Sequence, residues 1–232
     1  MVGYELMCEP NAEDIFFAIF GEPEMFYPDH AGTSYDWNGI YPPIVSAIRD
    51  MDAETPILLQ PMGYGSVVWL PYLQSTSDKL TVYTVHQYEP SSYTHQTPPL
   101  ENSYPGTFDA DYDKKLDQVN RSWLDTLLQT VDQVAAANDA PVAANEFGVM
   151  RFEPDASQFM DDLMGLLEQR GMNYALWEWA SSWEPFAWNN AFNFRHGPDL
   201  NNQTDVSTSD LLKVIKKYWG RNTVRPSTMG LQ

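Results

Sequence analysis

Acidic, histidine and aromatic side chains follow directly after several short apolar stretches of the chain. In the clearest stretch, residues 141–149, small and apolar residues lead into Asn145 and Glu146, and Gly148 then permits a sharp turn. A carboxylate at the end of a buried strand is costly unless it is paired or hydrogen-bonded, so Glu146 is the first candidate for a catalytic carboxylate. An ordinary solvent-exposed glutamate at a strand end is the alternative.

Three more strand-like segments end in the same way. Glu9 follows residues 2–8, His86 and Tyr88 follow residues 80–85, and Trp177 lies in residues 172–179. Two carboxylates can divide the hydrolysis of a glycosidic bond between them, because one protonates the leaving oxygen while the other attacks the anomeric carbon. A tryptophan face offers a platform for a sugar ring, and this chemistry requires no cofactor.

Alternation of strand and helix patterns along the chain predicts parallel strands joined by helical crossovers. The carboxyl ends of such strands meet at one edge of the sheet, which would bring the candidate side chains together. Strands are predicted at residues 2–8, 56–62, 80–85, 141–146 and 172–179, helices at 35–51, 67–73, 114–138, 155–170 and 209–219, and long loops at 89–112 and 180–208.

The overall composition excludes several classes of protein. The 232 residues include 13 Lys and Arg against 32 Asp and Glu, a formal charge of -19 that repels nucleic acids. The one cysteine, Cys8, permits no intramolecular disulfide, and the four histidines show no metal-ligand spacing, so no structural zinc is expected. No apolar run is long enough to cross a membrane, and no signal-peptide pattern follows Met1.

Four motifs in order resemble glycoside hydrolase family 5, the cellulase and mannanase family of clan A. They lie at the spacing of βα units and match the fourth, sixth, seventh and eighth strands of that family's (β/α)8 TIM barrel. The matching segments are Met7-Cys8-Glu9-Pro10, His86-Gln87-Tyr88, Asn145-Glu146-Phe147-Gly148 and Ala175-Leu176-Trp177-Glu178-Trp179.

The resemblance implies a retaining hydrolase of β-1,4-linked glucan or mannan. Glu9 would be the proton donor and later the base, and Glu146 would be the nucleophile. Tyr88 would hydrogen-bond Glu146, His86 would orient the site and bind sugar, and Trp177 would stack on the sugar. The rim loops would add accessory sugar contacts, with Trp183, Trp188 and Tyr93 as candidates. The resemblance also implies an oligo- or polysaccharide partner and a secreted protein.

Two features depart from the family pattern. Cys8 stands where the family has an asparagine that bonds the sugar 2-hydroxyl, and a thiol is a weaker donor. The resemblance also begins at the fourth strand, so the expected fold is an incomplete α/β TIM barrel of about five βα units over residues 1–220, with a tail at 221–232. Five strands cannot close such a barrel. We therefore expect a fragment of a longer protein or a misplaced start, with self-association through open edges.

Each assignment has a plainer alternative. Glu22, before Pro23, is a rival for the acid role of Glu9. His86 and Trp177 could be ordinary core residues, and Cys8 is expected to be a small buried residue beside the site. For the whole protein, the alternative function is a non-catalytic carbohydrate-binding remnant or an inactive truncated fragment.

Overall fold

The computed structural model describes residues 3–179 and 190–222, and these residues form two compact units. The first unit comprises Met1–Glu89, Ser122–Phe147 and Leu167–Leu176. The second comprises Pro90–Arg121, Gly148–Leu166 and Trp177–Gln232. Each unit is described by itself below.

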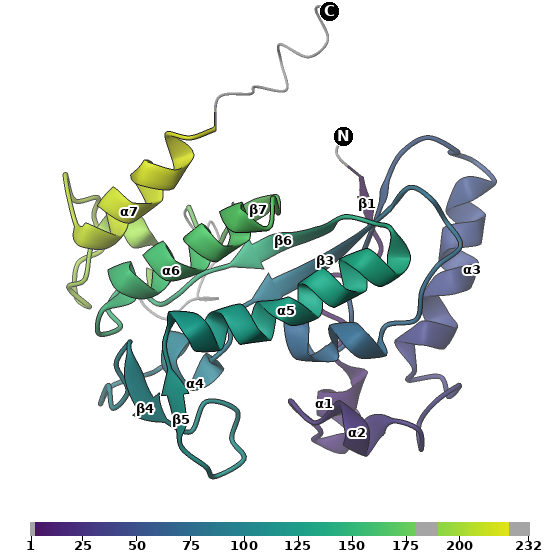
Figure 1. Cartoon of the computed structure of the whole chain (residues 1–232), viewed down its shortest axis with the longest axis horizontal. Coiled ribbons are helices and arrows are strands. Elements are labelled where there is room, and N and C mark those ends of the chain that lie inside the picture. The colour runs from purple at the N-terminus through teal and green to yellow at the C-terminus, as the bar shows by residue number, and fades with distance from the viewer. Residues whose placement is uncertain (1–2, 180–189, 223–232) are drawn as a thin grey trace, which may run out of the picture. The chain divides into compact units, whose positions relative to one another are not determined.

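A five-stranded parallel sheet forms the centre of the first unit (Figure 1). The central strand β3 is buried on both faces, as is usual for a parallel sheet that is covered by helices, whereas β6 also carries half-buried residues. Thr84 and Val85, which point to opposite faces of β3, are completely inaccessible to solvent. In spatial order the strands are β1 (Tyr4–Glu5), β2 (Ile57–Leu59), β3 (Thr81–Gln87), β6 (Val142–Phe147) and β7 (Tyr174–Leu176).

Helical crossovers connect these strands, as the sequence predicted. Helix α3 begins after Asp36, whose carboxylate accepts the backbone N–H of Asn38 as an N-cap. Pro42 and Pro43 lie inside α3, beyond its first turn. The helical segments of this unit are α1 (Ala12–Phe17), α2 (Pro23–Phe26), α3 (Trp37–Arg49), η1 (Val67–Tyr72) and all but the first residue of α5 (Arg121–Asn138).

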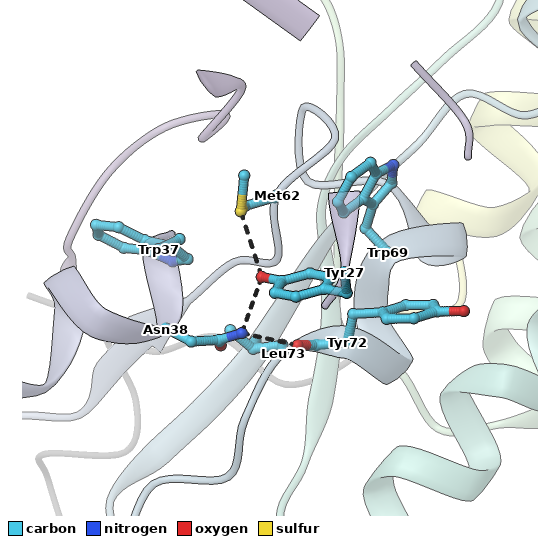
Figure 2. Close-up of a pocket in the computed structure, with 7 residues that line it drawn as sticks. All are labelled: Tyr27, Trp37, Asn38, Met62, Trp69, Tyr72 and Leu73. Carbon is cyan, nitrogen blue, oxygen red and sulfur yellow. Dashed lines mark hydrogen bonds between the residues drawn. The ribbon is translucent and has the colours of Figure 1, made fainter. Parts of the chain in front are cut away.

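An aromatic pocket ties the α2–α3 connection to η1 (Figure 2). The Tyr27 hydroxyl lies at its centre and donates to Asp36 Oδ1 at 2.9 Å. The Asn38 amide donates to that hydroxyl at 3.0 Å and to the Tyr72 carbonyl at 2.9 Å. Because these polar groups already satisfy one another, we assign the pocket a role in packing.

The second unit holds structure that the sequence patterns did not predict. The segment expected to be loop at 89–112 contains α4 (Ser91–Thr94) and β4 (Gly106–Phe108), and β4 pairs with β5 (Asp117–Val119) as an antiparallel hairpin. The helix expected from Lys114 therefore begins only at Arg121, and Leu116 is exposed. The remaining elements are η3 (Phe194–His196), α7 (Asp210–Trp219) and most of α6 (Ala156–Gln169). None of the described helices is long and apolar enough to span a membrane.

Candidate active site

Strand ends of the first unit bring Glu9, His86 and Glu146 together. Glu9 follows β1, His86 lies near the end of β3, and Glu146 near the end of β6. The register of the β3–β6 pair shifts between Val85 and His86, and this shift sets His86 opposite Glu146. One carboxylate oxygen of each glutamate and one ring nitrogen of His86 all lie within 4.8 Å of one another.

The buried imidazole of His86 bridges the two carboxylates. Its Nδ1 atom lies 2.7 Å from Glu9 Oε1 and 3.8 Å from Glu146 Oε2. Only 2% of the His86 side chain is accessible, against 32% for Glu9 and 20% for Glu146. The two carboxylates therefore reach solvent, while the group that positions them does not.

Tyr88 and the neighbouring charges set the protonation of Glu146. The Tyr88 hydroxyl donates to Glu146 Oε1 at 2.5 Å. Burial is the largest influence and raises the pKa of Glu146; the carboxylates of Glu9 and Glu5 act in the same direction. The charge of His86, when its ring is protonated, and the hydrogen bond from Tyr88 lower that pKa and so favour the ionised form, but burial outweighs them.

A buried glutamine that the motif analysis missed completes this cluster. Gln60 Oε1 accepts the backbone N–H of Glu9 at 3.0 Å, and Gln60 Nε2 lies 2.9 Å from His86 Nε2. The same Nε2 donates to Glu5, which also accepts from Asn145 at 2.6 Å. A polar residue at the end of an apolar strand was the signal that identified Glu146, and Gln60 follows residues 57–59 in the same way.

Gly65 closes over the Gln60–His86 pair. Its carbonyl accepts the backbone N–H of His86 at 2.9 Å. A Cβ atom at this position would lie 2.9 Å from Gln60 Oε1 and 3.3 Å from His86 Cγ, and the backbone has a φ of +75°. Glycine is required here both for the left-handed backbone and for the close approach.

Cys8 is exposed, which contradicts the expectation of a small buried residue. It directly precedes Glu9 in the irregular segment after β1, which spans only Tyr4–Glu5, so no strand pairing places its side chain against the sheet. Partial desolvation and the nearby charges of Glu9, Glu5 and Glu146 raise the pKa of the thiol to about 11. The thiol is therefore protonated at neutral pH.

The rival acid Glu22 immediately precedes α2 and is exposed. Among the described residues, Glu9 contacts His86, and this geometry favours Glu9 over Glu22 for the acid role.

Of the tryptophan and rim-loop candidates, the two that the structure describes, Trp177 and Tyr93, fall in the second unit. Trp177 is half-buried and is joined to Glu178 by a cis peptide bond, and its role as a sugar platform remains a prediction. Trp183 and Trp188 lie outside the described residues. Tyr93 is fully buried and donates to the carbonyl of Pro154 at 2.8 Å, so the expectation that it contacts sugar is wrong.

A second acidic group lies in the hairpin of the second unit. Carboxylate oxygens of Asp109, Asp111 and Asp117 lie within 4.8 Å of one another, which is close enough to hold a metal ion. Lys115 forms an ion pair with Asp113 in the same loop, and acidic loops of this kind commonly occur without a metal. We therefore assign it no role, and the expectation that the protein uses no metal remains a prediction.

Comparison with known proteins gives relatives of one kind. In sequence, the chain is 24% identical over 190 residues to Endoglucanase 3 of Fibrobacter succinogenes (strain ATCC 19169 / S85), covering 69% of this chain and 28% of the relative. In structure, it is similar to a hyperthermophilic endo-β-1,4-glucanase in complex with substrate, with a TM-score of 0.64 and 17% identity over 94% of this chain and 59% of the other. Thermotoga maritima Cel5A in complex with mannotriose gives a TM-score of 0.59 and 19% identity over 77% of this chain and 53% of the other.

These matches confirm the predicted fold class, since the parallel sheet and its helices correspond to part of a TIM barrel. The chain spans 28% of the curated relative and little more than half of the solved structures it matches. The model of the family described as Cellulase (glycosyl hydrolase family 5) matches residues 1–182. On the strength of that match, the chain belongs to glycosyl hydrolase family 5.

Proposed function

We propose that this chain carries the catalytic residues of a retaining glycoside hydrolase, with Glu146 as nucleophile and Glu9 as acid and base. The approach of their carboxylate oxygens to within 4.8 Å carries the proposal. Retaining glycosidases separate their two carboxyl groups by about 5–5.5 Å, whereas inverting enzymes leave about 6.5–9.5 Å for a water molecule. The observed approach favours direct attack on the sugar.

The two carboxylate oxygens of Glu146 have different roles in the proposed reaction. Tyr88 donates to Oε1 and fixes the carboxylate, which leaves Oε2 to attack the anomeric carbon. The attack forms a covalent glycosyl-enzyme as the bond to the leaving oxygen breaks. Because the donors favour the ionised form of Glu146 against the effect of burial, they keep the nucleophile reactive.

Glu9 is placed to handle the proton in both steps. Its Oε1 is engaged by His86, so Oε2 is the atom that carries the proton to the leaving oxygen. In the second step the same carboxylate takes a proton from water, and the resulting hydroxide equivalent releases the sugar from Glu146. A side chain that is 32% exposed can reach both substrate and water.

The proposed substrate is a β-1,4-linked glucan or mannan. The relatives support this class, because one is named an endo-β-1,4-glucanase and another was solved with mannotriose. Trp177 is proposed as the ring platform on the grounds of its position in the family motif. The net charge of -19 does not repel a neutral glycan.

The direct test is hydrolysis of an aryl β-cellobioside and an aryl β-mannobioside by the purified chain. Glu146→Gln should lower kcat by at least about 10⁴-fold while the protein stays folded, because the nucleophile is lost. Glu9→Gln should lower kcat/KM strongly for a poor leaving group and much less for dinitrophenolate, which leaves without a proton, while kcat falls for both because the second step loses its base. Glu54→Gln, an exposed change in the same unit, is the control. Turnover that is unchanged in Glu146→Gln would end the proposal.

A second candidate function is glycan binding without hydrolysis, and Cys8 is the observation that favours it. The thiol stands where the family motif places an asparagine, and it is exposed beside Glu9. This candidate predicts that the chain binds cello- or manno-oligosaccharides but does not release an aryl group. If the unsubstituted protein shows no turnover and Cys8→Asn does, the missing asparagine donor at position 8 explains why the protein is inactive.

A further inference from the structure

We propose that Gln60 is a positioning residue that holds His86 as the neutral imidazole with its proton on Nδ1. The proton then points at Glu9, which is the acid and base of the proposed function. The Gln60 side chain contacts the backbone N–H of Glu9, the His86 ring and the Glu5 carboxylate, and we assign its effect on Glu9 to the His86 ring.

The orientation of the Gln60 amide follows from two partners whose roles are fixed. The backbone N–H of Glu9 can only donate, so the amide atom 3.0 Å from it must be the oxygen. The carboxylate of Glu5 accepts, so the atom beside it must be the NH₂ group. The reverse orientation would set donor against donor and acceptor against acceptor.

This orientation determines which nitrogen of His86 carries the proton. The Gln60 NH₂ group has two hydrogens; one goes to Glu5, and the other faces His86 Nε2 at 2.9 Å. Nε2 must therefore offer its lone pair, and the single proton of the neutral ring lies on Nδ1. Nδ1 in turn lies 2.7 Å from Glu9 Oε1 and donates to it.

Burial of both side chains strengthens the preference for the proton on Nδ1 of His86. Gln60 is 1% exposed and His86 is 3% exposed, so water cannot readily replace either partner. Gly65 lies close to both groups, since a Cβ atom at this position would be 2.9 Å from Gln60 Oε1 and 3.3 Å from His86 Cγ. A buried donor or acceptor without a partner is costly, so the alternative ring state is disfavoured.

The surrounding charges would otherwise favour a doubly protonated ring. Glu9 and Glu146 face Nδ1, Glu5 lies behind the amide, and the fully buried Glu89 interacts with the His86 charge. A second proton on Nε2 would point directly at the NH₂ group of Gln60. The amide therefore opposes the pull of these carboxylates and keeps the ring neutral.

For the proposed reaction, this tautomer protects the catalytic proton. If Nδ1 carried a lone pair, protonated Glu9 would donate its proton to His86 at 2.7 Å and not to the leaving oxygen of the sugar. With Nδ1–H as a donor, Oε1 of Glu9 is occupied and the proton stays on the other oxygen. This consequence rests on the proposed function, whereas the tautomer itself does not.

The test is ¹⁵N NMR of the whole chain with ¹⁵N-labelled histidine. Spectra of His30→Gln, His95→Gln and His196→Gln identify the three other histidines and leave His86 assigned. In the unsubstituted protein, we expect Nδ1 of His86 to be directly bonded to a proton and Nε2 to resonate as an unprotonated nitrogen. A proton on Nε2, alone or together with one on Nδ1, at neutral pH would overturn the proposal, and this result needs no variant at position 60.

The variant Gln60→Glu then tests the role of the NH₂ group that Gln60 presents to His86. It preserves an oxygen for the N–H of Glu9 but puts a carboxylate opposite Nε2, so Nε2 of His86 should become protonated. Gln118→Glu, at an exposed position of β5, makes the same change elsewhere and should leave the His86 signals unaltered. If Gln60→Glu also leaves them unaltered, Gln60 does not set the state of the ring.

Activity separates failure of this inference from failure of the proposed function. With a poor leaving group, Gln60→Glu should lower kcat/KM by about 10- to 100-fold, because proton donation to the leaving oxygen is impaired. With dinitrophenolate the loss of kcat/KM should be smaller, because that group leaves without a proton. A protein with the expected tautomer but no turnover supports the inference and contradicts the proposed function. A kcat/KM that is equally lowered for both leaving groups would show a general structural role and overturn the link to Glu9.

Discussion

Glu146 and Glu13 are both glutamates of the first unit whose pKa burial raises, yet their partners differ. Glu146 accepts from the Tyr88 hydroxyl at 2.5 Å, lies beside His86, and keeps 20% of its side chain accessible. Glu13 is completely inaccessible and accepts one backbone N–H, from Gly63 at 2.9 Å. Its other oxygen has no hydrogen-bond partner in the described part of the chain.

The difference shows that burial alone does not identify a working carboxylate. Glu146 has the Tyr88 hydroxyl, which favours the ionised form, and a side that is open to solvent. Glu13, whose pKa rises to about 7, is stabilised in the neutral form and holds α1 against the turn after β2. Glu146, the catalytic candidate, differs from Glu13, the structural residue, in two ways: its neighbours favour the charged carboxylate, and solvent can reach it.

Removing the hydroxyl from Tyr88 should erase part of this difference. Tyr88→Phe loses a hydrogen bond to a charged group, which is worth about 1.5–3 kcal/mol, so kcat/KM should fall by about 10- to 100-fold. Tyr88 also lowers the pKa of Glu146, so the acid limb of the pH–rate profile should move to higher pH. Tyr4→Phe, which removes another tyrosine–carboxylate bond of the unit at 2.9 Å, is the matched control. Equal profiles for the two variants would contradict the role of Tyr88.

Replacing Glu13 should change stability in a pH-dependent way. Because its folded pKa of about 7 exceeds its usual value of 4.5, the stability that Glu13 contributes is fully present below pH 4.5 and is lost as pH rises through 7. Relative to Glu13→Gln, the unsubstituted protein should lose about 2 kcal/mol of unfolding free energy between pH 5 and pH 8, allowing for solvent screening. Urea unfolding at both pH values measures this, with Glu54→Gln as a control for net charge. If the difference in unfolding free energy between the unsubstituted protein and Glu13→Gln does not change with pH, the conclusion that Glu13 is neutral is wrong.

Glycine substitution tests the packing behind the site. Gly65→Ala should cost about 1–2 kcal/mol for its left-handed backbone and more for the contact with Gln60, and it should also lower turnover. Gly32 has a φ of +73° but nothing within 4 Å of an added Cβ, so Gly32→Ala should show the backbone cost alone. If thermal unfolding and turnover respond equally to both changes, the close approach of Gly65 is unimportant.

Local sequence patterns predicted the strands of the parallel sheet and the polar residues at their ends. The apolar strands, and the polar residues that end them, identified Glu9, His86, Tyr88 and Glu146 because the ends of parallel strands must meet. The structure brings these four residues together by hydrogen bonds and close contacts. The roles assigned to them remain predictions.

Other features depend on contacts between segments that no local pattern reveals. The β4–β5 hairpin lies in stretches rich in proline and charge, which resemble loop and helix in sequence. The exposure of Cys8 follows from how short β1 is, and the importance of Gln60 follows from a His86 side chain 26 positions away. The proline pair within α3 shows that packing overrides helix propensity.

Trapping of the covalent intermediate tests the central claim most directly. Dinitrophenyl 2-deoxy-2-fluoro-β-cellobioside should add one fluorinated disaccharide to the chain, and peptide mass spectrometry should locate it on Glu146. Glu9→Gln should still be labelled, because dinitrophenolate leaves without a proton, whereas Glu146→Gln should not be labelled. A protein that hydrolyses the ordinary glycoside but carries the label on another residue, or forms no adduct at all, would contradict the two-glutamate account.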